Sequence, residues 1–282
     1  MRTPEETAQA RLYQGPVKAV ILDWSGTTAD AYVIAPAIVF VEVFHNQGVD
    51  ISMEEARGPM GLRKDLHIRA LTETPEIRRR WIDVHGTEPT QADVDRMFAD
   101  FVPLQLECLP RYTALLPGVA DVTQALQSEN IKIGSTTGFI RPMVDVLERD
   151  AAEQGYVPDA SVAGDEVEHG ARPSPFMVYR NLDLLDAWPI QSVIKVDDTV
   201  GGVGEGLNAG CWAVGIARYS NYMNINSLEE AESISQEELD RRLHLTRQRL
   251  TEAGAHYVIN TFTELPGVVE DVNERLSTGQ HP

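Results

Sequence analysis

A single acidic residue, Asp23, follows a short apolar run and precedes a turn of small and hydroxylated residues. The run is Val20-Ile21-Leu22, and the turn begins Trp24-Ser25-Gly26-Thr27-Thr28. Open α/β sheets hold their reacting groups at the carboxyl ends of buried strands, and a turn of this kind presents N–H groups and hydroxyls to an anion. Two interpretations stay open from these residues alone: a nucleophilic carboxylate facing a phosphoryl group, or a carboxylate that caps a turn.

Apolar segments alternate with charged, helical ones along the chain, as is typical of a parallel sheet. We predict buried strands at residues 18–22, 131–134, 192–196, 211–215 and 256–259. We predict helices at residues 35–44, 119–128, 144–154 and 228–253, and a last helix ending near residue 276. Three strands end in polar clusters: Asp23, Thr136-Thr137 and Asp197-Asp198. The predicted fold class is therefore α/β, a doubly wound, Rossmann-like parallel sheet whose three clusters meet at one rim.

The region between the first two predicted strands shows helical patterns without a strand pattern. It is charged and contains N-capping signals such as Ser52-Met-Glu-Glu and Thr90-Gln-Ala-Asp. We predict a core of residues 1–32 and 113–282, with residues 33–112 inserted as a helical cap above the strand ends. A length of 282 residues is sufficient for one α/β domain and a smaller insertion.

The charge of the chain limits its partners. A formal net charge of -19 argues against a nucleic-acid partner, because phosphate backbones are neutralised by Lys and Arg. An anionic substrate must then be met by a local cation or a metal ion. The two cysteines, Cys108 and Cys211, have no metal-like spacing, so we expect a reducing compartment, the cytoplasm. We expect no signal peptide and no membrane contact, because no apolar run has the required length.

A lysine within the predicted cap falls on the apolar face of a predicted helix at residues 59–71. The face is formed by Met60, Lys64, His67, Ile68 and Leu71. A lysine among apolar side chains loses hydration, which lowers its pKa and frees the neutral amine to form imines with carbonyl compounds. The alternative, a lysine that covers apolar surface with its stem, is commoner for a lone lysine. A core histidine is the corresponding alternative for His67.

An acid, a hydroxyl and an acidic pair at successive strand ends resemble the haloacid dehalogenase superfamily. The resemblance implies that Asp23 attacks the substrate, a threonine binds a phosphoryl oxygen and the acidic pair holds Mg²⁺, which prefers oxygen ligands. Phosphatases of that superfamily carry a second Asp two residues after the nucleophile as general acid and base. This chain has Ser25 there, so a leaving group activated by other means is implied.

The order and spacing of several motifs over residues 17–270 resemble the phosphonoacetaldehyde hydrolase family more closely. The motifs are Asp23-Trp-Ser-Gly-Thr-Thr, Pro59-Met-Gly-Leu-Arg-Lys64-Asp-Leu-His67, Lys132-Ile-Gly-Ser-Thr-Thr137-Gly, Arg172-Pro-Ser-Pro-Phe-Met, Lys195-Val-Asp-Asp198-Thr and Glu205-Gly-Leu-Asn-Ala-Gly. The resemblance implies a haloacid dehalogenase core with a helical cap, dependence on Mg²⁺, and a homodimer. It also implies cleavage of the C–P bond of phosphonoacetaldehyde to acetaldehyde and phosphate.

The same resemblance implies a role for individual residues. Asp23 would attack phosphorus, and Lys64 would form an imine with the aldehyde, so that the carbon leaves phosphorus as an enamine. Thr137, with Thr136 as the competing choice, and Arg172 would bind the phosphonate, although an Arg before a Pro turn is otherwise typical of a surface. Further residues are implied in the substrate pocket, namely Met60, Gly61 and His67, the last as a possible proton shuttle. The implied Mg²⁺ ligands are Asp23, the backbone carbonyl of Ser25, Asp198 and Asp197.

Three positions depart from the family pattern. Ser25 stands where Ala is common, Phe139 stands where Tyr is common, and Gly202 stands where some members carry an acid. We expect Asp197 to replace that acid, directly or through a water. The alternatives are a related hydrolase acting on another phosphonate aldehyde, one acting on a halogenated acid, and a binding protein that has lost turnover.

Overall fold

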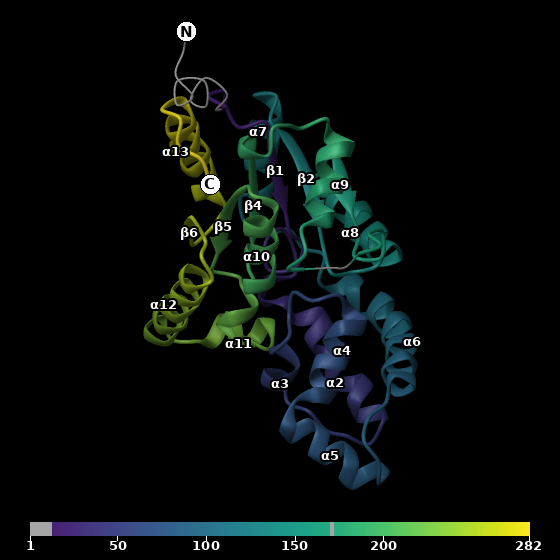
Figure 1. Ribbon diagram of the computed structural model, residues 1–282. Coiled ribbons are helices and arrows are strands. Elements are labelled where there is room, and N and C mark those ends of the chain that lie inside the picture. Colours follow the sequence, from purple (N-terminus) through teal and green to yellow (C-terminus); the bar gives the residue numbers. More distant parts are fainter. Residues whose placement is uncertain (1–12, 170–171) are drawn as a thin grey trace.

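A six-stranded parallel sheet forms the centre of the computed structural model, which describes residues 13–169 and 172–282 (Figure 1). The strands are β1 (Ala19–Leu22), β2 (Lys132–Thr136), β3 (Ala160–Val162), β4 (Val193–Asp197), β5 (Trp212–Ile216) and β6 (Tyr257–Ile259). Their order is β3-β2-β1-β4-β5-β6, with every neighbouring pair parallel. This confirms the predicted doubly wound sheet. The five predicted strands are present with ends shifted by one or two residues, whereas β3 was not predicted.

Helices cover both faces of the sheet because alternate strand residues point to opposite sides. Ala19 and Ile21 of β1 pack with Val178 of α9, whereas Val20 and Leu22 belong to the core cluster that contains the apolar sides of α7 and α13. The core helices are α7 (Val119–Ser128), α8 (Arg141–Glu153), α9 (Phe176–Leu185), α10 (Val200–Ala209), α11 (Leu228–Ser233), α12 (Gln236–Glu252) and α13 (Leu265–Ser277).

Five helices between β1 and α7 form a second lobe below the sheet in Figure 1. They are α2 (Ile34–Asn46), α3 (Met53–Arg57), α4 (Lys64–Glu73), α5 (Pro75–His85) and α6 (Gln91–Cys108). Both predicted capping signals form capping boxes, at Ser52 and at Thr90. The division at residues 33 and 112 stays a prediction, and we keep the name cap for this lobe.

The predicted helix at residues 59–71 is wrong in its first turn. Helix α4 begins at Lys64, and Met60 lies in the preceding turn, so the two do not share a helix face. The reason is Gly61, whose φ of 98° is in the left-handed region that glycine adopts without strain. A Cβ on Gly61 would lie 2.7 Å from Oγ1 of Thr199, so this turn of the cap presses closely on the core.

The sheet order explains why the polar clusters meet. Leu22 of β1 pairs with Ser135 of β2 on one side and with Val196 of β4 on the other. The residues that follow each strand therefore converge at one edge of the sheet, the edge next to the cap. Within the described ranges, no helix combines the length and apolar composition needed to cross a bilayer.

Candidate active site

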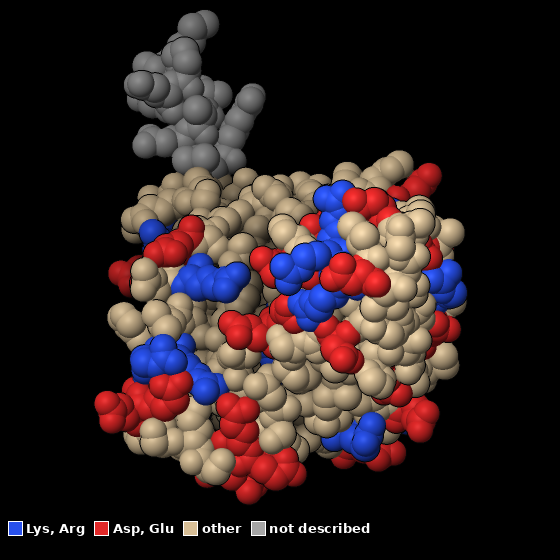
Figure 2. Space-filling model, turned by 90° about the horizontal axis from the view of Figure 1, so that it is seen from below, with Lys and Arg blue, Asp and Glu red and all other residues tan. Residues whose placement is uncertain are grey.

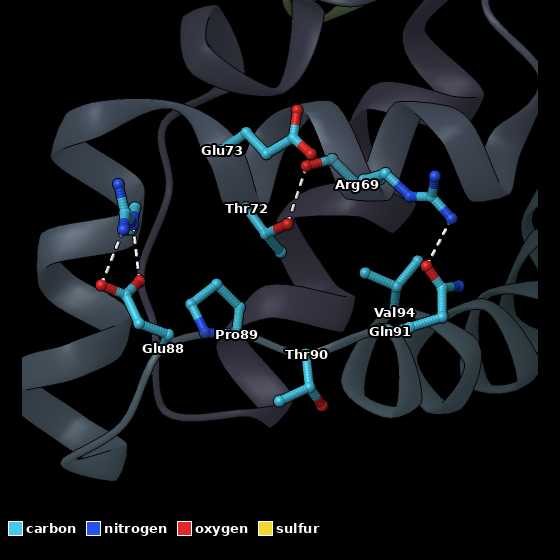
Figure 3. A pocket seen from close by; sticks show the side chains of 9 residues that line it. Arg69, Thr72, Glu73, Glu88, Pro89, Thr90, Gln91 and Val94 are labelled. Atoms are coloured by element: carbon cyan, nitrogen blue, oxygen red, sulfur yellow. Dashed lines mark hydrogen bonds and ion pairs between the residues drawn. The ribbon is translucent and has the colours of Figure 1, made fainter.

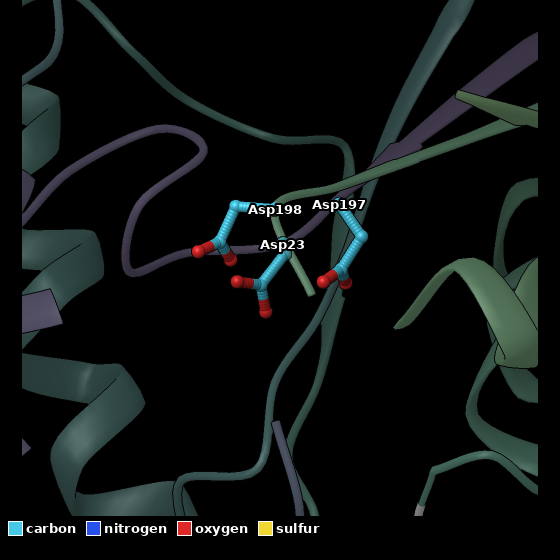
Figure 4. A group of neighbouring side chains, drawn as sticks. All are labelled: Asp23, Asp197 and Asp198. Atoms are coloured by element: carbon cyan, nitrogen blue, oxygen red, sulfur yellow. The ribbon is translucent and has the colours of Figure 1, made fainter. Parts of the chain in front are cut away.

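Three carboxylates meet at the carboxyl edge of the sheet. Asp23 follows β1, Asp197 ends β4, and Asp198 comes next; one oxygen of each lies within 4.8 Å of the others. Figure 4 shows Asp23 between the other two. All three side chains are buried, so each carboxylate disfavours the ionised form of its neighbours.

The pKa values of Asp198 and Asp23 are both raised, first by burial and then by the neighbouring carboxylates. Burial, followed by the charges of Asp197 and Asp23, raises the pKa of Asp198 well above its usual range. Burial also raises the pKa of Asp23 to about 6, against the opposing attraction of Arg172. Oδ2 of Asp198 accepts from the backbone N–H of Asn221 at 2.8 Å, whereas its buried Oδ1 has no hydrogen-bond partner among the described residues.

This set of oxygens fits a divalent cation. Carboxylates and a backbone carbonyl are the hard ligands that Mg²⁺ prefers, and it keeps several waters. Asp23, Ser25 and Asp198 line the same cavity, and Oδ1 of Asp198 is a buried acceptor without a described donor. A cation beside these groups would favour their ionised forms and so oppose the rise of their pKa values.

Asp197 differs from Asp198 in its hydrogen bonds, because both of its carboxylate oxygens accept from protein donors. Oδ1 accepts from the N–H and the hydroxyl of Thr199 at 3.0 and 2.8 Å, and Oδ2 accepts from Lys195 at 2.8 Å. Although burial alone would raise the pKa of Asp197, Arg172 and Lys195 hold it below its ordinary value. Its expected support of Mg²⁺ stays a prediction.

Asp197 occupies the space above Gly202. A Cβ built on Gly202 would lie 1.8 Å from Cγ of Asp197, which no pair of atoms tolerates. A side chain at position 202 therefore cannot coexist with this conformation of Asp197. The expectation that Asp197 replaces an acid at position 202 stays a prediction.

Arg172 forms ion pairs with three buried carboxylates. Its Nη2 lies 2.7 Å from Oδ1 of Asp23 and 3.1 Å from Oδ2 of Asp197, and its Nε lies 3.0 Å from Oε2 of Glu205. Lys195 adds a second cation, 2.8 Å from Asp197 and 3.7 Å from Glu205. We call these five residues, Asp23, Arg172, Lys195, Asp197 and Glu205, the ion cluster.

Two members of the ion cluster were not predicted as functional residues. Lys195 lies inside the apolar strand β4, and Glu205 lies within α10; both are fully buried. The available signal was the lysine itself, because a charged residue within a buried strand is rare unless it is paired. The pairing partner could not be read from local sequence, since it comes from another segment.

Arg172 is buried rather than at the surface. Burial opposes its charge, but the carboxylates of Asp197, Asp23 and Glu205 raise its pKa above the ordinary range. Its Nη1 takes part in none of the hydrogen bonds found among the described residues, and the side chain lines the cavity. The guanidinium thus orients the nucleophile candidate and can still meet an anion.

One small cavity, of about 20 Å³, lies between the core and the cap. Its wall contains eight of the residues expected to react with the substrate, bind it or hold the metal, namely the seven residues Asp23, Ser25, Met60, Gly61, Lys64, Thr137 and Arg172 and, as the eighth, Asp198. Val33, Gly138, Phe139 and Thr199 also line it. Thr136 faces the ion cluster instead, because its hydroxyl donates to Glu205 and accepts from Arg172.

His67 is not among the residues that line this cavity. Its ring stacks on Phe40, with centroids 3.8 Å apart, and Nε2 lies 2.8 Å from the carbonyl of Ala56. Burial and the charge of Lys64 lower its pKa well below the usual value. The contacts connect α4 with the end of α3 and match the alternative of a core histidine; a proton-shuttle role stays a prediction.

Lys64, the first residue of α4, has a side chain that reaches into the cavity. Its Nζ lies 4.6 Å from the ring centroid of Phe139 and 5.8 Å from that of Phe40. Burial lowers the pKa of Lys64 to about 8, even though the charge of Asp23 opposes this shift. A substantial fraction of the amine is therefore neutral, and nucleophilic, in weakly alkaline solution.

The cavity differs from a larger hollow in the cap, whose arginines are engaged by neighbouring side chains. A larger hollow of about 470 Å³ lies within the cap, but its arginines are used internally: Arg78 pairs with Glu88 at 2.5 Å, and Arg69 bonds Gln91 (Figure 3). On the face shown in Figure 2, basic and acidic side chains are interspersed. The arginines of this larger hollow are engaged within the cap, whereas Arg172 lines the buried cavity.

Mg²⁺ is predicted to raise the melting temperature of the wild-type protein, because it relieves repulsion among buried carboxylates. At one hundred times its Kd the gain is about 2.7 kcal/mol, and each kcal/mol shifts the melting temperature by about 2–4 °C. Asp198→Asn should lose most of the shift and Asp197→Asn a smaller part, in thermal melts with and without Mg²⁺. The control is Asp240→Asn, an exposed residue of α12. A full shift in Asp198→Asn would remove Asp198 from the metal site.

Comparison with known proteins gives the family of this chain. A family model for haloacid dehalogenase-like hydrolases matches residues 17–210. The chain is 46% identical over 259 residues to a phosphonoacetaldehyde hydrolase of Bacillus cytotoxicus, covering 92% of this chain and 97% of that one. It is 40% identical over 270 residues to one of Syntrophobacter fumaroxidans, covering 96% and 97%.

A solved structure is similar over nearly the whole chain. It is a crystal structure of a phosphonoacetaldehyde hydrolase-like protein from Oleispira antarctica, with a TM-score of 0.92 and 36% identity, covering 96% of this chain and 98% of that one. Sequence and structure comparisons thus agree over both the core and the cap. The chain belongs to the phosphonoacetaldehyde hydrolase family of haloacid dehalogenase-like hydrolases.

Proposed function

We propose that this protein hydrolyses the C–P bond of phosphonoacetaldehyde to acetaldehyde and phosphate. The observation that carries the proposal is that Asp23 from the core and Lys64 from the cap line one buried cavity. A carboxylate can attack phosphorus, and a buried amine with a lowered pKa can condense with an aldehyde. Few other substrates would use both groups at once, and the names of the relatives support this one.

The proposed reaction begins at Lys64. The neutral amine adds to the aldehyde carbon, a water leaves, and a protonated imine forms. This cation can accept the electron pair of the C–P bond, which a simple phosphonate cannot release as a bare carbanion. The departing carbon needs no proton at that moment, which explains why Ser25 can stand where phosphatases of this superfamily carry an acid.

Asp23 then attacks phosphorus. A bond forms between a carboxylate oxygen and phosphorus, the C–P bond breaks, and its electrons enter the imine to give an enamine on Lys64. Water hydrolyses the acyl phosphate on Asp23 and releases phosphate. The enamine takes a proton on carbon, and a second water hydrolyses the resulting imine to acetaldehyde and the free amine. One water is consumed overall, because imine formation releases another.

The remaining cavity residues bind the phosphonate oxygens. Arg172 is held by Asp23 and Glu205 at 2.7 and 3.0 Å, so its guanidinium is already oriented before an anion binds. The Thr137 hydroxyl, in the cavity wall, is the second proposed ligand. Asp23, Asp198 and the Ser25 carbonyl would hold Mg²⁺, which supplies positive charge beside the transferred group. We also propose the earlier expectation that Asp197 supports this ion.

Two broader expectations remain proposals. A homodimer is supported only by family resemblance. A cytoplasmic location is supported by Cys108 and Cys211, which are buried and unpaired in the structure, as a reducing compartment allows.

Phosphate release from phosphonoacetaldehyde tests the proposed function. The wild-type protein should release phosphate when Mg²⁺ is present and lose this activity in a chelator. Asp23→Asn should reduce the rate by at least about 10³-fold, because the nucleophile is gone. The next longer phosphonate aldehyde and a halogenated acid serve as alternative substrates. Faster turnover of either one would contradict the assignment, as would near-normal activity in Asp23→Asn.

Lys64 is predicted to form a covalent imine that borohydride can trap. With acetaldehyde as the partner, trapping should rise with pH and reach half its maximum near pH 8, because only the neutral amine reacts and the pKa is lowered to about 8. Mass spectrometry of digested protein locates the adduct. Lys64→Arg is the matched control, because a guanidinium stays protonated. An adduct on other lysines only, or a midpoint near pH 10, would defeat the role of Lys64.

Arg172→Lys is predicted to lower kcat/KM by about 10–100-fold, which corresponds to the roughly 1.5–3 kcal/mol of a hydrogen bond to a charged group. An ammonium group cannot contact Asp23, Glu205 and the phosphonate with the geometry of a planar fork. The matched control is Arg141→Lys, since Arg141 makes a two-donor contact with Glu166 outside the cavity. Equal kcat/KM in the two variants would leave Arg172 without a role in substrate binding.

A further inference from the structure

The reacting groups are closed off from solvent. Asp23 and Lys64 are each 5% exposed, Arg172 is 3% exposed, and the cavity of about 20 Å³ holds no more than a water molecule. An organic substrate therefore enters only if the cap moves relative to the core. The inference that the cap moves rests on the proposed function, because it assumes that an aldehyde of several heavy atoms reaches Lys64.

One cap residue is anchored in the core on the outer side of this cavity. Arg57, the last residue of α3, is 4% exposed and donates to the carbonyls of Tyr32 and Ile225, the latter at 2.6 Å. It also donates to the side-chain oxygens of Asn221 and Asn226, each at 3.1 Å. Asn221 returns a hydrogen bond to the Arg57 carbonyl at 3.2 Å. These contacts join α3 to the core segment that follows β5.

The partner of Arg57 also holds a carboxylate of the candidate metal site. The backbone N–H of Asn221 donates to Oδ2 of Asp198 at 2.8 Å, and the hydroxyl of Ser220 donates to the Asp198 carbonyl at 2.8 Å. Asn221 thus contacts Asp198 through its backbone and Arg57 through its side chain. A short chain of hydrogen bonds connects the cap to the residue expected to bind Mg²⁺.

The connection between β1 and the cap is strained where Arg57 reaches it. Asp30, Tyr32 and Val33 have φ values of 49°, 67° and 55°, in the left-handed region that non-glycine residues, and β-branched ones above all, avoid. Tyr32 is fixed from both sides, since its N–H donates to the Tyr219 carbonyl at 2.7 Å and its carbonyl accepts from Arg57. Strain of this kind persists only where surrounding contacts hold it.

We infer that Arg57 is a latch: a positioning residue that holds the cap closed and, through Asn221, couples closure to the placement of Asp198. When the latch is released, the strained connection at residues 30–33 can relax and the cap can open. When it is engaged, Lys64 and Asp23 line one closed cavity, and Asp198 accepts a hydrogen bond from Asn221. Because such coupling is reciprocal, a cation that fixes Asp198 also favours the closed cap.

The latch is tested on the full-length protein with Arg57→Ala, Asn221→Ala and the double variant. Asn221→Ala removes the contacts to Arg57 while it keeps the backbone N–H that holds Asp198. Arg78→Ala is the matched control, because Arg78 pairs only with Glu88 inside the cap. Circular dichroism first establishes that each variant is folded.

Small-angle X-ray scattering without substrate should give a larger radius of gyration for Arg57→Ala than for the wild type or Arg78→Ala. Proteolysis within residues 30–33 should be at least about tenfold faster, as expected when the open state gains population. In phosphate release, KM should rise more than kcat falls, and the half-saturating Mg²⁺ concentration should increase. The double variant should change these quantities by less than the sum of the two single variants, because the hydrogen bond between the two side chains is lost in each of them.

The latch is refuted if folded Arg57→Ala keeps the wild-type radius, cleavage rate and KM, or if Arg78→Ala changes them equally. Full additivity in the double variant would also refute it. If Arg57→Ala does not fold, Arg57→Lys replaces it, since an ammonium group keeps the charge but not the four contacts, and the same directions are expected. Scattering and proteolysis test the latch even if phosphonoacetaldehyde proves not to be the substrate.

Discussion

The buried pair between Arg172 and Asp23 is the interaction on which the rest of the site depends. Four carboxylates, Asp23, Asp197, Asp198 and Glu205, are buried near two permanently paired cations, Arg172 and Lys195. Without these cations the strand ends could not hold so many ionised groups, since each unpaired buried charge is strongly unfavourable. These carboxyl groups outnumber the two cations, an arrangement that suits a divalent cation. Burial, together with the neighbouring carboxylates, raises the pKa values of Asp23 and Asp198.

Burial of Asp23 in the core and of Lys64 in the cap gives the two lobes different chemical environments at the site. The core supplies a carboxylate among cations, where an anionic phosphonate can bind despite the acidic chain. The cap supplies Lys64 beside the rings of Phe139 and Phe40, where loss of hydration favours the neutral amine. Neither environment is complete when the lobes separate, because water would reach Lys64 and restore its ordinary pKa. In the proposed reaction, closure is therefore part of the chemistry, and the inferred role of Arg57 connects its contacts to that closure.

Sequence reasoning predicted the sheet and the convergence of its polar strand ends, since both follow from strand patterns and parallel topology. It placed Asp23, Thr137 and Asp198 at the correct edge for that reason. Sequence reasoning wrongly predicted a helix at residues 59–63, because the apolar spacing continues through Gly61, where the backbone leaves the helical conformation. It also did not predict the short strand β3. The roles of Lys195 and Glu205 escaped it, because a charge buried inside one segment is explained only by a partner from another. Arg172 lies in no periodic pattern, and only family resemblance pointed to it.

The central claim is that the imine on Lys64 must form before Asp23 can take the phosphoryl group. Rapid acid quench of the enzyme with phosphonoacetaldehyde, followed by mass spectrometry of the peptide that contains Asp23, tests this order directly. We predict a phosphoryl adduct on Asp23 in the wild-type protein during turnover and none in folded Lys64→Arg at the same substrate and Mg²⁺ concentrations. A phosphoryl adduct on Asp23 in Lys64→Arg, at a level comparable with the wild type, would contradict the account.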